Sequence, residues 1–326
     1  MNKKLLLTVF AASAMVFGGC NAEKVTSSNT QETTAVSENV DEKADETVTV
    51  VHTLGETVVP KNPKNVVVLE YGILDALESL GVEVKGVAMG SGMPEYLTKY
   101  NDKEKYESVG SIKEVDMEKV YEVEPELIII GGRLADYYDE LSRIAPTIQL
   151  GVEASDYLNS FTANMTYLGQ IFDKEALVNE KLESINKQIE EVAQKAEEKG
   201  VNGLIALTNG DSFSVYGKGS RFGFIHNELG IKPVDETIAV STHGQNASFE
   251  YIVEQNPDYL FVVDRTAVVS SEGSAAALFD NELIRSTTAA KNDQIIYLNP
   301  TIWYAAGGGF TSTQMMIDEI NSALEK

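Results

Sequence analysis

One sequence pattern occurs twice in this chain, as DMEKVYEVEPELIIIGGR at residues 116–133 and as SFEYIVEQNPDYLFVVDR at residues 248–265. The two copies align without a gap, 132 positions apart. Each copy begins with a residue type that caps helices, runs through a short helical pattern to a proline, and then enters an apolar run typical of a buried strand. Each copy ends on an arginine where the predicted strand stops. The repeat predicts two related α/β lobes.

Strand and helix patterns alternate around the first copy. Val66–Leu69 is a short apolar run of strand type, and Val84–Ala88 is a second one. Between them, Ile73–Leu80 has the spacing of a helix, which Gly81 is expected to end. This alternation is typical of an α/β fold.

A long helical segment separates the two copies of the repeat. No glycine or proline interrupts the chain from Asp173 to Lys199, and Gly200 follows. Apolar residues three or four positions apart form one stripe along it, as in an amphipathic helix. They are Leu182, Ile185, Ile189, Val192 and Ala196. At 1.5 Å per residue such a helix reaches roughly 40 Å. We therefore predict a rigid helix that joins the two lobes.

The N-terminus has the features of a bacterial lipoprotein leader. Lys3 and Lys4 precede the apolar run Leu5–Phe17, which is shorter than a membrane-spanning helix. Two glycines then precede Cys20, as in a lipobox, although Phe17 stands where leucine is usual. The alternative is a plain secretory signal with a chance cysteine. The polar residues 21–47 show no apolar periodicity, which is typical of a flexible tether.

The predicted organisation divides the 326 residues into five parts. These are a signal peptide at 1–19 with lipidation at Cys20, a tether at 20–47, an N-terminal lobe at 48–165, a connecting helix at 166–200 and a C-terminal lobe at 201–326. The formal net charge of −24 argues against a nucleic-acid-binding protein, which would present a basic surface. The single cysteine excludes an intrachain disulfide and any zinc site built on paired cysteines.

Three of the five arginines stand at positions that suggest a ligand site. Arg133 and Arg265 follow the two repeated strands, and α/β proteins bind ligands beyond the carboxyl ends of their strands. Arg221 lies in the glycine-rich turn Gly217–Gly223. Guanidinium groups suit anionic oxygens. The alternative is that each arginine pairs with a surface carboxylate, but three arginines placed in this way predict a shared anion pocket.

One histidine and two aromatic residues are further candidates. His243 lies in a loop directly before the second repeat helix, where the alternative is a solvated loop histidine. Trp303 and Tyr304 precede three consecutive glycines and are expected on a loop. We predict that this aromatic pair forms a wall of the ligand pocket, the alternative being that it caps the core.

Several stretches resemble one known family. They include GKGSRFG at residues 217–223, THG at 242–244, NPDYLFVVDR at 256–265 and the Trp303–Tyr304 pair, within a similarity that runs from about Val48 to the C-terminus. The chain resembles the iron–siderophore-binding lipoproteins of ABC importers, above all their petrobactin/enterobactin-type catecholate subgroup. The resemblance implies a fold like that of the periplasmic binding proteins with a helical backbone, in which a ligand cleft lies between the two lobes.

The resemblance also implies roles for individual residues. Arg133, Arg221 and Arg265 would line the cleft and contact the deprotonated catecholates. His243 and Tyr304 would complete the coordination of the ferric iron when the ligand offers only two catechols. Ferric iron is a hard cation that prefers oxygen ligands. The sequence Ala-Ala-Gly-Gly-Gly at residues 305–309 departs from the family pattern and is expected to alter the rim of the cleft.

The partners implied by the resemblance are a ferric siderophore, petrobactin-like or a bis-catecholate, and the permease and ATPase of an ABC importer. Glu118 and Glu250, at equivalent positions of the repeat, would dock onto arginines of the permease. The protein would be a monomer without intrinsic cofactor or enzymatic activity, held by lipid on the extracytoplasmic face of the cell membrane, on a Gram-positive surface.

Other classes of protein remain open at this point. A metal-ion, haem or corrinoid binding protein could share the same fold, although the three histidines are too scattered for a bare metal site. A surface adhesin is another candidate. A chelatase-like enzyme is a weaker one, since no nucleophile or acid–base set stands out in the sequence.

Overall fold

The computed structural model describes residues 46–270 and 275–326, all within one compact unit, Ala44–Lys326. The predicted signal peptide, Cys20 and nearly all of the tether lie outside the described residues. The described part opens with an antiparallel hairpin of β1 (Thr47–His52) and β2 (Gly55–Pro60). None of the helices in the described ranges is long and apolar enough to span a membrane.

The N-terminal lobe is built on a parallel sheet of five strands in the order β5-β4-β3-β6-β7. The strands β3 and β6 are fully buried, as expected for the centre of a parallel sheet covered on both faces. The chain passes from β3 to β4 on one side and later returns to β6 on the other, so a topological switch point lies between β3 and β6. The strands are β3 (Val66–Leu69), β4 (Gly86–Val87), β5 (Glu107–Ser108), β6 (Leu127–Ile130) and β7 (Thr147–Gln149).

The helices of this lobe follow the strands. The predicted helix at 73–80 is α1, which begins two residues earlier, and the second predicted strand is shorter than expected because only β4 pairs within the sheet. The helices are α1 (Tyr71–Ser79), η1 (Glu95–Asn101), α2 (Met117–Glu122), η2 (Gly132–Tyr137), α3 (Tyr138–Leu141) and α4 (Tyr157–Ile171).

The C-terminal lobe has a mixed sheet in the order β11-β9-β8-β12-β13, with β10 also beside β8. The strands β8, β12 and β13 are parallel, whereas β9 runs antiparallel to β8 and β11 antiparallel to β9. The switch point lies between β8 and β12. The strands are β8 (Asn202–Asn209), β9 (Ser212–Tyr216), β10 (Lys232–Pro233), β11 (Gln245–Asn246), β12 (Tyr259–Asp264) and β13 (Ile295–Leu298).

Short helices connect these strands, and a longer one closes the chain. One of them, η3, is a π-helical turn. They are α6 (Phe224–Asn227), α7 (Phe249–Gln255), α8 (Arg265–Val269), α9 (Ala275–Phe279), α10 (Glu282–Arg285), α11 (Thr288–Lys291), η3 (Ile302–Ala306) and α12 (Phe310–Glu325).

The two copies of the repeat form the same local structure, α2 followed by β6 and α7 followed by β12. The side chains of Asp116 and Ser248 cap these helices by accepting the backbone N–H three residues later, at 3.1 and 3.4 Å. After the helix, Glu124 and Asn256 both adopt left-handed backbone angles, with φ of 51° and 45°, immediately before the proline. The same turn therefore carries the chain from helix to central strand in both lobes, and the prediction of two related α/β lobes is confirmed.

The connecting segment differs from the prediction at its beginning. The range 166–200 contains the end of α4, a short turn and then α5 (Glu175–Lys199), rather than one helix. Asp173 breaks the helix because its φ is 52°, and its carboxylate accepts a hydrogen bond from Lys61 Nζ at 2.8 Å, which ties the turn to the end of β2. The predicted apolar stripe is buried along α5, together with Val178.

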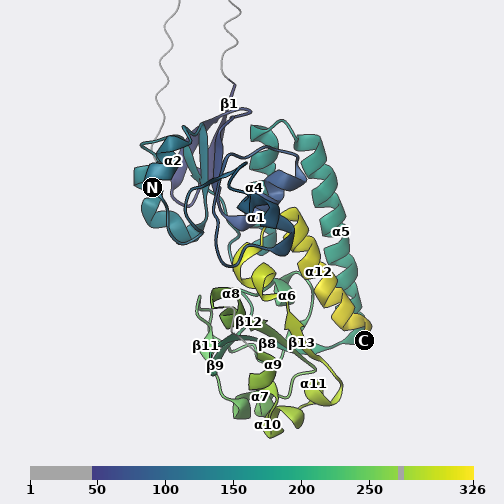
Figure 1. Cartoon of the computed structure of the whole chain (residues 1–326). Helices are drawn as coiled ribbons and strands as arrows, with labels where there is room; N and C mark the ends of the chain where they lie inside the picture. Colours follow the sequence, from purple (N-terminus) through teal and green to yellow (C-terminus); the bar gives the residue numbers. More distant parts are fainter. Residues whose placement is uncertain (1–45, 271–274) are drawn as a thin grey trace, which may run out of the picture. The chain divides into compact units, whose positions relative to one another are not determined.

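The last helix is not confined to the C-terminal lobe, to which the range 201–326 assigned it. Instead, α12 packs against both α5 and α1, and Figure 1 shows α12 in yellow beside α5 in teal. Gln188 of α5 bonds with Gln314 of α12 at 2.8 Å, and Lys195 of α5 donates to Asn321 at 2.6 Å. Two helices rather than one therefore connect the lobes.

Candidate ligand-binding site

A cleft of about 690 Å³ lies where the carboxyl ends of strands from both sheets meet. Its walls come from the segments that follow β3, β6 and β7 in one lobe and from the β9–α6 loop, residues 240–242 and η3 in the rest of the chain. Ligands of α/β proteins bind beyond the carboxyl ends of strands at topological switch points, and the switch point between β3 and β6 opens here, where Glu70, Gly132 and Arg133 line the cleft. The volume suits a small-molecule ligand.

Three arginines converge on Tyr304 of η3. Arg133 and Arg221 donate from Nη2 to the Tyr304 carbonyl oxygen at 2.9 and 2.6 Å. Arg265 donates from Nε to the phenol oxygen at 2.9 Å. All three guanidinium groups also lie near the ring of Tyr304. The distance from the guanidinium carbon to the ring centroid is 5.9 Å for Arg133, 4.2 Å for Arg221 and 5.8 Å for Arg265. The structure thus brings together the three arginines that the sequence singled out, and Arg133 and Arg221 line the cleft.

These arginines lack carboxylate partners within ion-pair distance. None of the ion pairs found in the described ranges involves Arg133, Arg221 or Arg265. Their hydrogen bonds go to uncharged oxygens, such as Asn209 Oδ1, which accepts from Arg265 at 2.5 Å. Burial and the neighbouring charge of Arg133 lower the pKa of Arg221. Within the described residues, the three arginines therefore do not form the surface ion pairs that were the alternative, and they bring positive charge to one site of a strongly acidic protein.

The arginines also change the acidity of the Tyr304 phenol. Burial raises the pKa of Tyr304, but the hydrogen bond from Arg265 and the charges of Arg221, Arg265 and Arg133 together outweigh burial, so the pKa is lowered. A lowered pKa favours the phenolate, which is a ligand for a hard cation such as Fe³⁺.

Sequence reasoning missed Glu70, which lines the cleft with only 9 % of its surface exposed. It follows directly after β3, at the switch point. Burial raises the pKa of Glu70, while Arg133 and Arg221 act in the opposite direction. The signal that pointed to Arg133 and Arg265, a polar residue just after a predicted buried strand, is also present at Glu70.

Trp303 and Tyr304 lie on the π-helical turn η3 rather than on an open loop. Trp303 touches the cleft but is only 5 % exposed. Its indole Nε1 donates to Glu319 Oε2 of α12 at 2.6 Å. A buried tryptophan needs such a partner for its N–H. Most of the indole therefore packs in the core, while Trp303 and Tyr304 both contribute to the lining of the cleft.

His243 is not placed on the wall of the cleft. Its side chain is exposed, and its backbone N–H donates to Ser241 Oγ at 3.2 Å. The neighbouring Ser241 and Thr242 line the cleft, but His243 does not. Within the described ranges, no group of three or more His, Cys, Asp or Glu side chains could hold a metal ion by itself.

The glycines after Tyr304 allow close packing against α1, and most of them do not line the cleft. Only Gly307 among them lines the cleft. A methyl group built on Gly72 of α1 would collide with the carbonyl oxygen of Gly307, and one built on Gly309 would collide with Asp75 of α1. The glycines let the chain between η3 and α12 approach α1 closely, which positions Tyr304 opposite the N-terminal lobe's Arg133.

Glu118 and Glu250 occupy the first turns of α2 and α7, and both side chains are exposed. Hydrogen bonds from the backbone of Glu250 and from the Ser248 side chain lower the pKa of Glu250. Each lobe therefore presents one carboxylate at the equivalent repeat position, outside the cleft.

The chain is similar to several characterised binding proteins. Petrobactin-binding protein YclQ of Bacillus subtilis (strain 168) is 41% identical over 100% of both sequences. Its crystal structure matches with a TM-score of 0.83 at 44% identity, over 86% of this chain and 99% of that one. Ferric-anguibactin-binding protein FatB of Vibrio anguillarum (strain ATCC 68554 / 775) is 33% identical over 84% of this chain and 86% of FatB.

A second solved structure is that of the periplasmic catecholate-siderophore binding protein VctP from Vibrio cholerae, with a TM-score of 0.81 at 38% identity. It covers 85% of this chain and 100% of VctP. A family model described as periplasmic binding protein matches residues 66–301. The paired α/β lobes, the cleft at their strand ends and these similarities agree, and the chain belongs to the periplasmic binding protein family.

Proposed function

We propose that this protein captures a ferric catecholate siderophore and delivers it to the permease of an ABC importer for iron uptake. The observation that carries the proposal is the convergence of three arginines without carboxylate partners on one tyrosine in the cleft. Ferric catecholates are anionic, and charge-assisted hydrogen bonds from guanidinium groups to their oxygens offset the cost of partial desolvation. A bare cation would be repelled by such a cleft.

The names of the relatives support the ligand class. YclQ is described as binding petrobactin and VctP as binding catecholate siderophores. We infer a petrobactin-like siderophore or another bis-catecholate as the ligand here. Arg133, Arg221 and Arg265 would contact the catecholate oxygens, and the Tyr304 phenolate would take an open position on the iron. His243 would reach the iron only after movement of its loop, because its side chain is exposed away from the cleft wall.

The remaining parts of the proposal concern delivery. The protein would be anchored by lipid at Cys20 on the extracytoplasmic face of the membrane, and Glu118 and Glu250 would dock on the permease, whose ATPase drives transport. The protein itself would act as a monomeric binding protein rather than an enzyme.

Binding of defined iron complexes tests the function. A ferric bis-catecholate and a ferric tris-catecholate are expected to quench tryptophan fluorescence, because Trp303 is the only tryptophan and touches the cleft. Ligand at 100 times its dissociation constant should raise the free energy of unfolding by about 2.7 kcal/mol. A ferric trihydroxamate without net negative charge serves as the control ligand and should bind far more weakly. Equal binding of both classes, or no binding of either catecholate, would contradict the proposal.

Substitution of the arginines adds a second arm to this test. Replacing Arg133, Arg221 or Arg265 by Gln is expected to weaken catecholate binding by about 1.5–3 kcal/mol for each charge-assisted contact. Arg285 is a matched control, because it is exposed and paired with Asp280 at 2.6 Å outside the cleft. Arg285→Gln should leave the affinity unchanged.

A further inference from the structure

The cleft contains two acidic residues of very different exposure. Glu153 is exposed at the mouth, whereas Glu70 is 9 % exposed on the inner wall. A buried carboxyl group inside a site that would receive an anion needs an explanation, since its charge opposes the ligand.

The local structure holds the Glu70 carboxyl at the junction of β3 and β6. Glu70 has extended backbone angles, with φ −141° and ψ 125°, directly before α1. Its side chain lies against Gly131, and a methyl group built on Gly131 would collide with Glu70 Oε2. The turn after β6 therefore keeps a glycine where the carboxyl group needs the space, two residues before Arg133.

The charged and titratable groups that face Glu70 come from three segments. Arg133 is contributed by η2 and Arg221 by the β9–α6 loop. From α1 come the backbone N–H groups of Tyr71 and Gly72, and the Tyr71 phenol, whose pKa burial and the charge of Glu70 raise to about 12. Tyr71 therefore stays neutral over the ordinary pH range. Burial raises the pKa of the Glu70 carboxyl, so Glu70 is the group among these that we expect to take up a proton.

The empty cleft and the occupied cleft favour different protonation states of Glu70. In the empty cleft, a carboxylate offsets the repulsion between Arg133 and Arg221. In the occupied cleft, the anionic ligand does so, and a carboxylate on the inner wall would repel the ligand at short range in a partly desolvated site. Both burial and the ligand's charge favour the neutral acid when the site is full.

We propose that Glu70 couples the binding of an anionic ligand to the uptake of one proton. The proton comes from the buffer and adds to one carboxylate oxygen of Glu70, and no bond of the ligand changes. The inference rests on the proposed function, and it assigns to that function a proton-accepting residue. In the pH window between the free and the ligand-bound pKa of Glu70, affinity falls by about tenfold per pH unit as pH rises.

Calorimetric titration with a ferric tris-catecholate tests this proposal. The catechols fill all coordination positions of the iron, so Tyr304 gives up no proton to the metal. The binding enthalpy is measured between pH 5 and pH 9 in pairs of buffers with different ionisation enthalpies. The wild-type protein should take up as much as one proton per complex in part of this range. Glu70→Gln should take up none and should bind with an affinity independent of pH.

Glu153→Gln is the matched control, because it removes the exposed acid at the mouth of the same cleft and should leave the proton uptake intact. Equal uptake in wild type and Glu70→Gln would overturn the proposal. Should the Glu70 variant not fold, the wild-type measurement decides alone: binding heat without proton uptake at every pH overturns the proposal. Absence of binding heat altogether would overturn the proposed function, and the inference with it.

Discussion

At the scale of single residues, Tyr304 carries the most information about the ligand. Its carbonyl and phenol oxygens accept from arginines of both lobes, and its pKa is lowered in spite of burial. A residue held in this way is prepared to bind a hard cation as a phenolate without large rearrangement. Exposed His243 lacks comparable support.

Comparing ligands with two and with three catechols distinguishes residues that coordinate the iron from residues that recognise the charge of the complex. A ferric bis-catecholate leaves two iron positions open, whereas a tris-catecholate leaves none. The double variant His243→Ala/Tyr304→Phe should therefore weaken bis-catecholate binding by about tenfold or more, and tris-catecholate binding much less. Fluorescence titration of both complexes measures the difference. The single variants His243→Ala and Tyr304→Phe show which residue causes the loss of bis-catecholate affinity, and we expect Tyr304→Phe to account for most of it. Equal losses for both ligands would mean that the two residues only shape the cleft.

Glu228 makes stability depend on pH at a site away from the arginines. Burial raises its pKa to about 7, its carboxyl group faces the backbone N–H of Leu158 in α4, and its Oε2 is buried without a hydrogen-bond partner in the described structure. The folded state therefore binds more protons than the unfolded state between about pH 4.5 and 7, so this group's stabilising contribution is present at low pH and is lost as pH rises through 7.

Replacement of Glu228 isolates this contribution. Glu228→Gln should gain stability relative to wild type on going from pH 5 to pH 8, on the order of 1–2 kcal/mol, since one pKa unit corresponds to about 1.4 kcal/mol and solvent screens part of the effect at this half-buried group. Chemical denaturation at the two pH values measures the difference in the free energy of unfolding. Glu122→Gln, on the exposed face of α2, is the control and should show the same pH dependence as wild type. A constant difference between Glu228→Gln and wild type at both pH values contradicts the prediction.

Sequence reasoning found the residues that a repeat or a glycine-rich turn marks. Arg133 and Arg265 were predictable because the repeat places both at strand ends. Glu70 has the same signal, a polar residue directly after a predicted buried strand, but it lies outside the repeat, and its proximity to Arg133 and Arg221 arises only on folding. The burial of Trp303 was hidden for a similar reason, since its partner Glu319 comes from α12 and only packing brings the two together.

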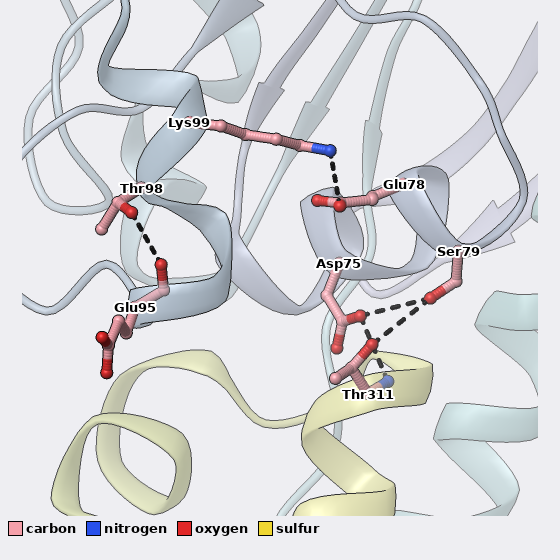
Figure 2. A network of polar contacts seen from close by, with 7 residues as sticks. All are labelled: Asp75, Glu78, Ser79, Glu95, Thr98, Lys99 and Thr311. Atoms are coloured by element: carbon pink, nitrogen blue, oxygen red, sulfur yellow. Dashed lines mark hydrogen bonds and ion pairs between the residues drawn. The ribbon is translucent and has the colours of Figure 1, made fainter.

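At the scale of elements, the junction between α1 and α12 determines where η3 lies. The first N–H groups of a helix lack partners within it, and Gly309 has no side chain to cap α12. Asp75 of α1 supplies the cap: Oδ1 accepts from Thr311 N at 3.1 Å and Oδ2 from Ser312 N at 2.7 Å. Figure 2 shows Asp75 pointing at Thr311, with Ser79 beside them and the Lys99–Glu78 ion pair further along α1.

Asp75→Asn should show how much this cap contributes. The amide keeps the shape but replaces one accepting oxygen by a donor that faces another N–H, and it removes the negative charge at the helix N-terminus. We expect a loss on the order of 1–3 kcal/mol in the free energy of unfolding, with a weaker affinity for catecholates because η3 precedes α12. Lys99→Gln removes the neighbouring exposed ion pair and should cost no more than about 1 kcal/mol. A larger effect of Lys99→Gln than of Asp75→Asn would contradict this account.

The elements themselves were largely predictable, and their partners were not. Periodicity predicted α5 and its buried stripe, because those residues pack on one face over many turns. The break at Asp173 was hidden, since no glycine or proline marks it and its cause is a contact with Lys61 from a distant hairpin. The position of α12 was equally hidden, because an amphipathic helix does not specify which surface it covers.

At the scale of the molecule, charge is distributed unevenly. The chain carries a net charge of −24, yet three arginines that form no ion pair within the described residues meet at Tyr304 on the cleft wall. Long-range repulsion of an anionic ligand is screened beyond roughly 8–10 Å in physiological salt, so the local charge of the cleft decides binding. The exposed acids then remain available for a different contact, with a basic surface of a partner.

Glu118 and Glu250 are the acids best placed for such a contact, because the repeat puts one on each lobe at the same helix position. Both lie outside the cleft, so the double variant Glu118→Ala/Glu250→Ala should bind ferric catecholates as tightly as wild type. In cells it should support little or no iron uptake. Removing an acid from a helix N-terminus costs only about 0.3–1 kcal/mol for each site, so misfolding should not explain the loss.

The repeat also provides the matched control for this experiment. Glu122 and Glu254 are a second pair of exposed acids at equivalent positions, one turn further along the same two helices. If docking depends on the position of the carboxylates rather than on net charge, Glu122→Ala/Glu254→Ala should transport normally although it loses the same two charges. Uptake that falls equally in both double variants would point to net charge. Normal uptake in Glu118→Ala/Glu250→Ala would remove these residues from the docking surface while leaving ligand capture by the cleft untouched.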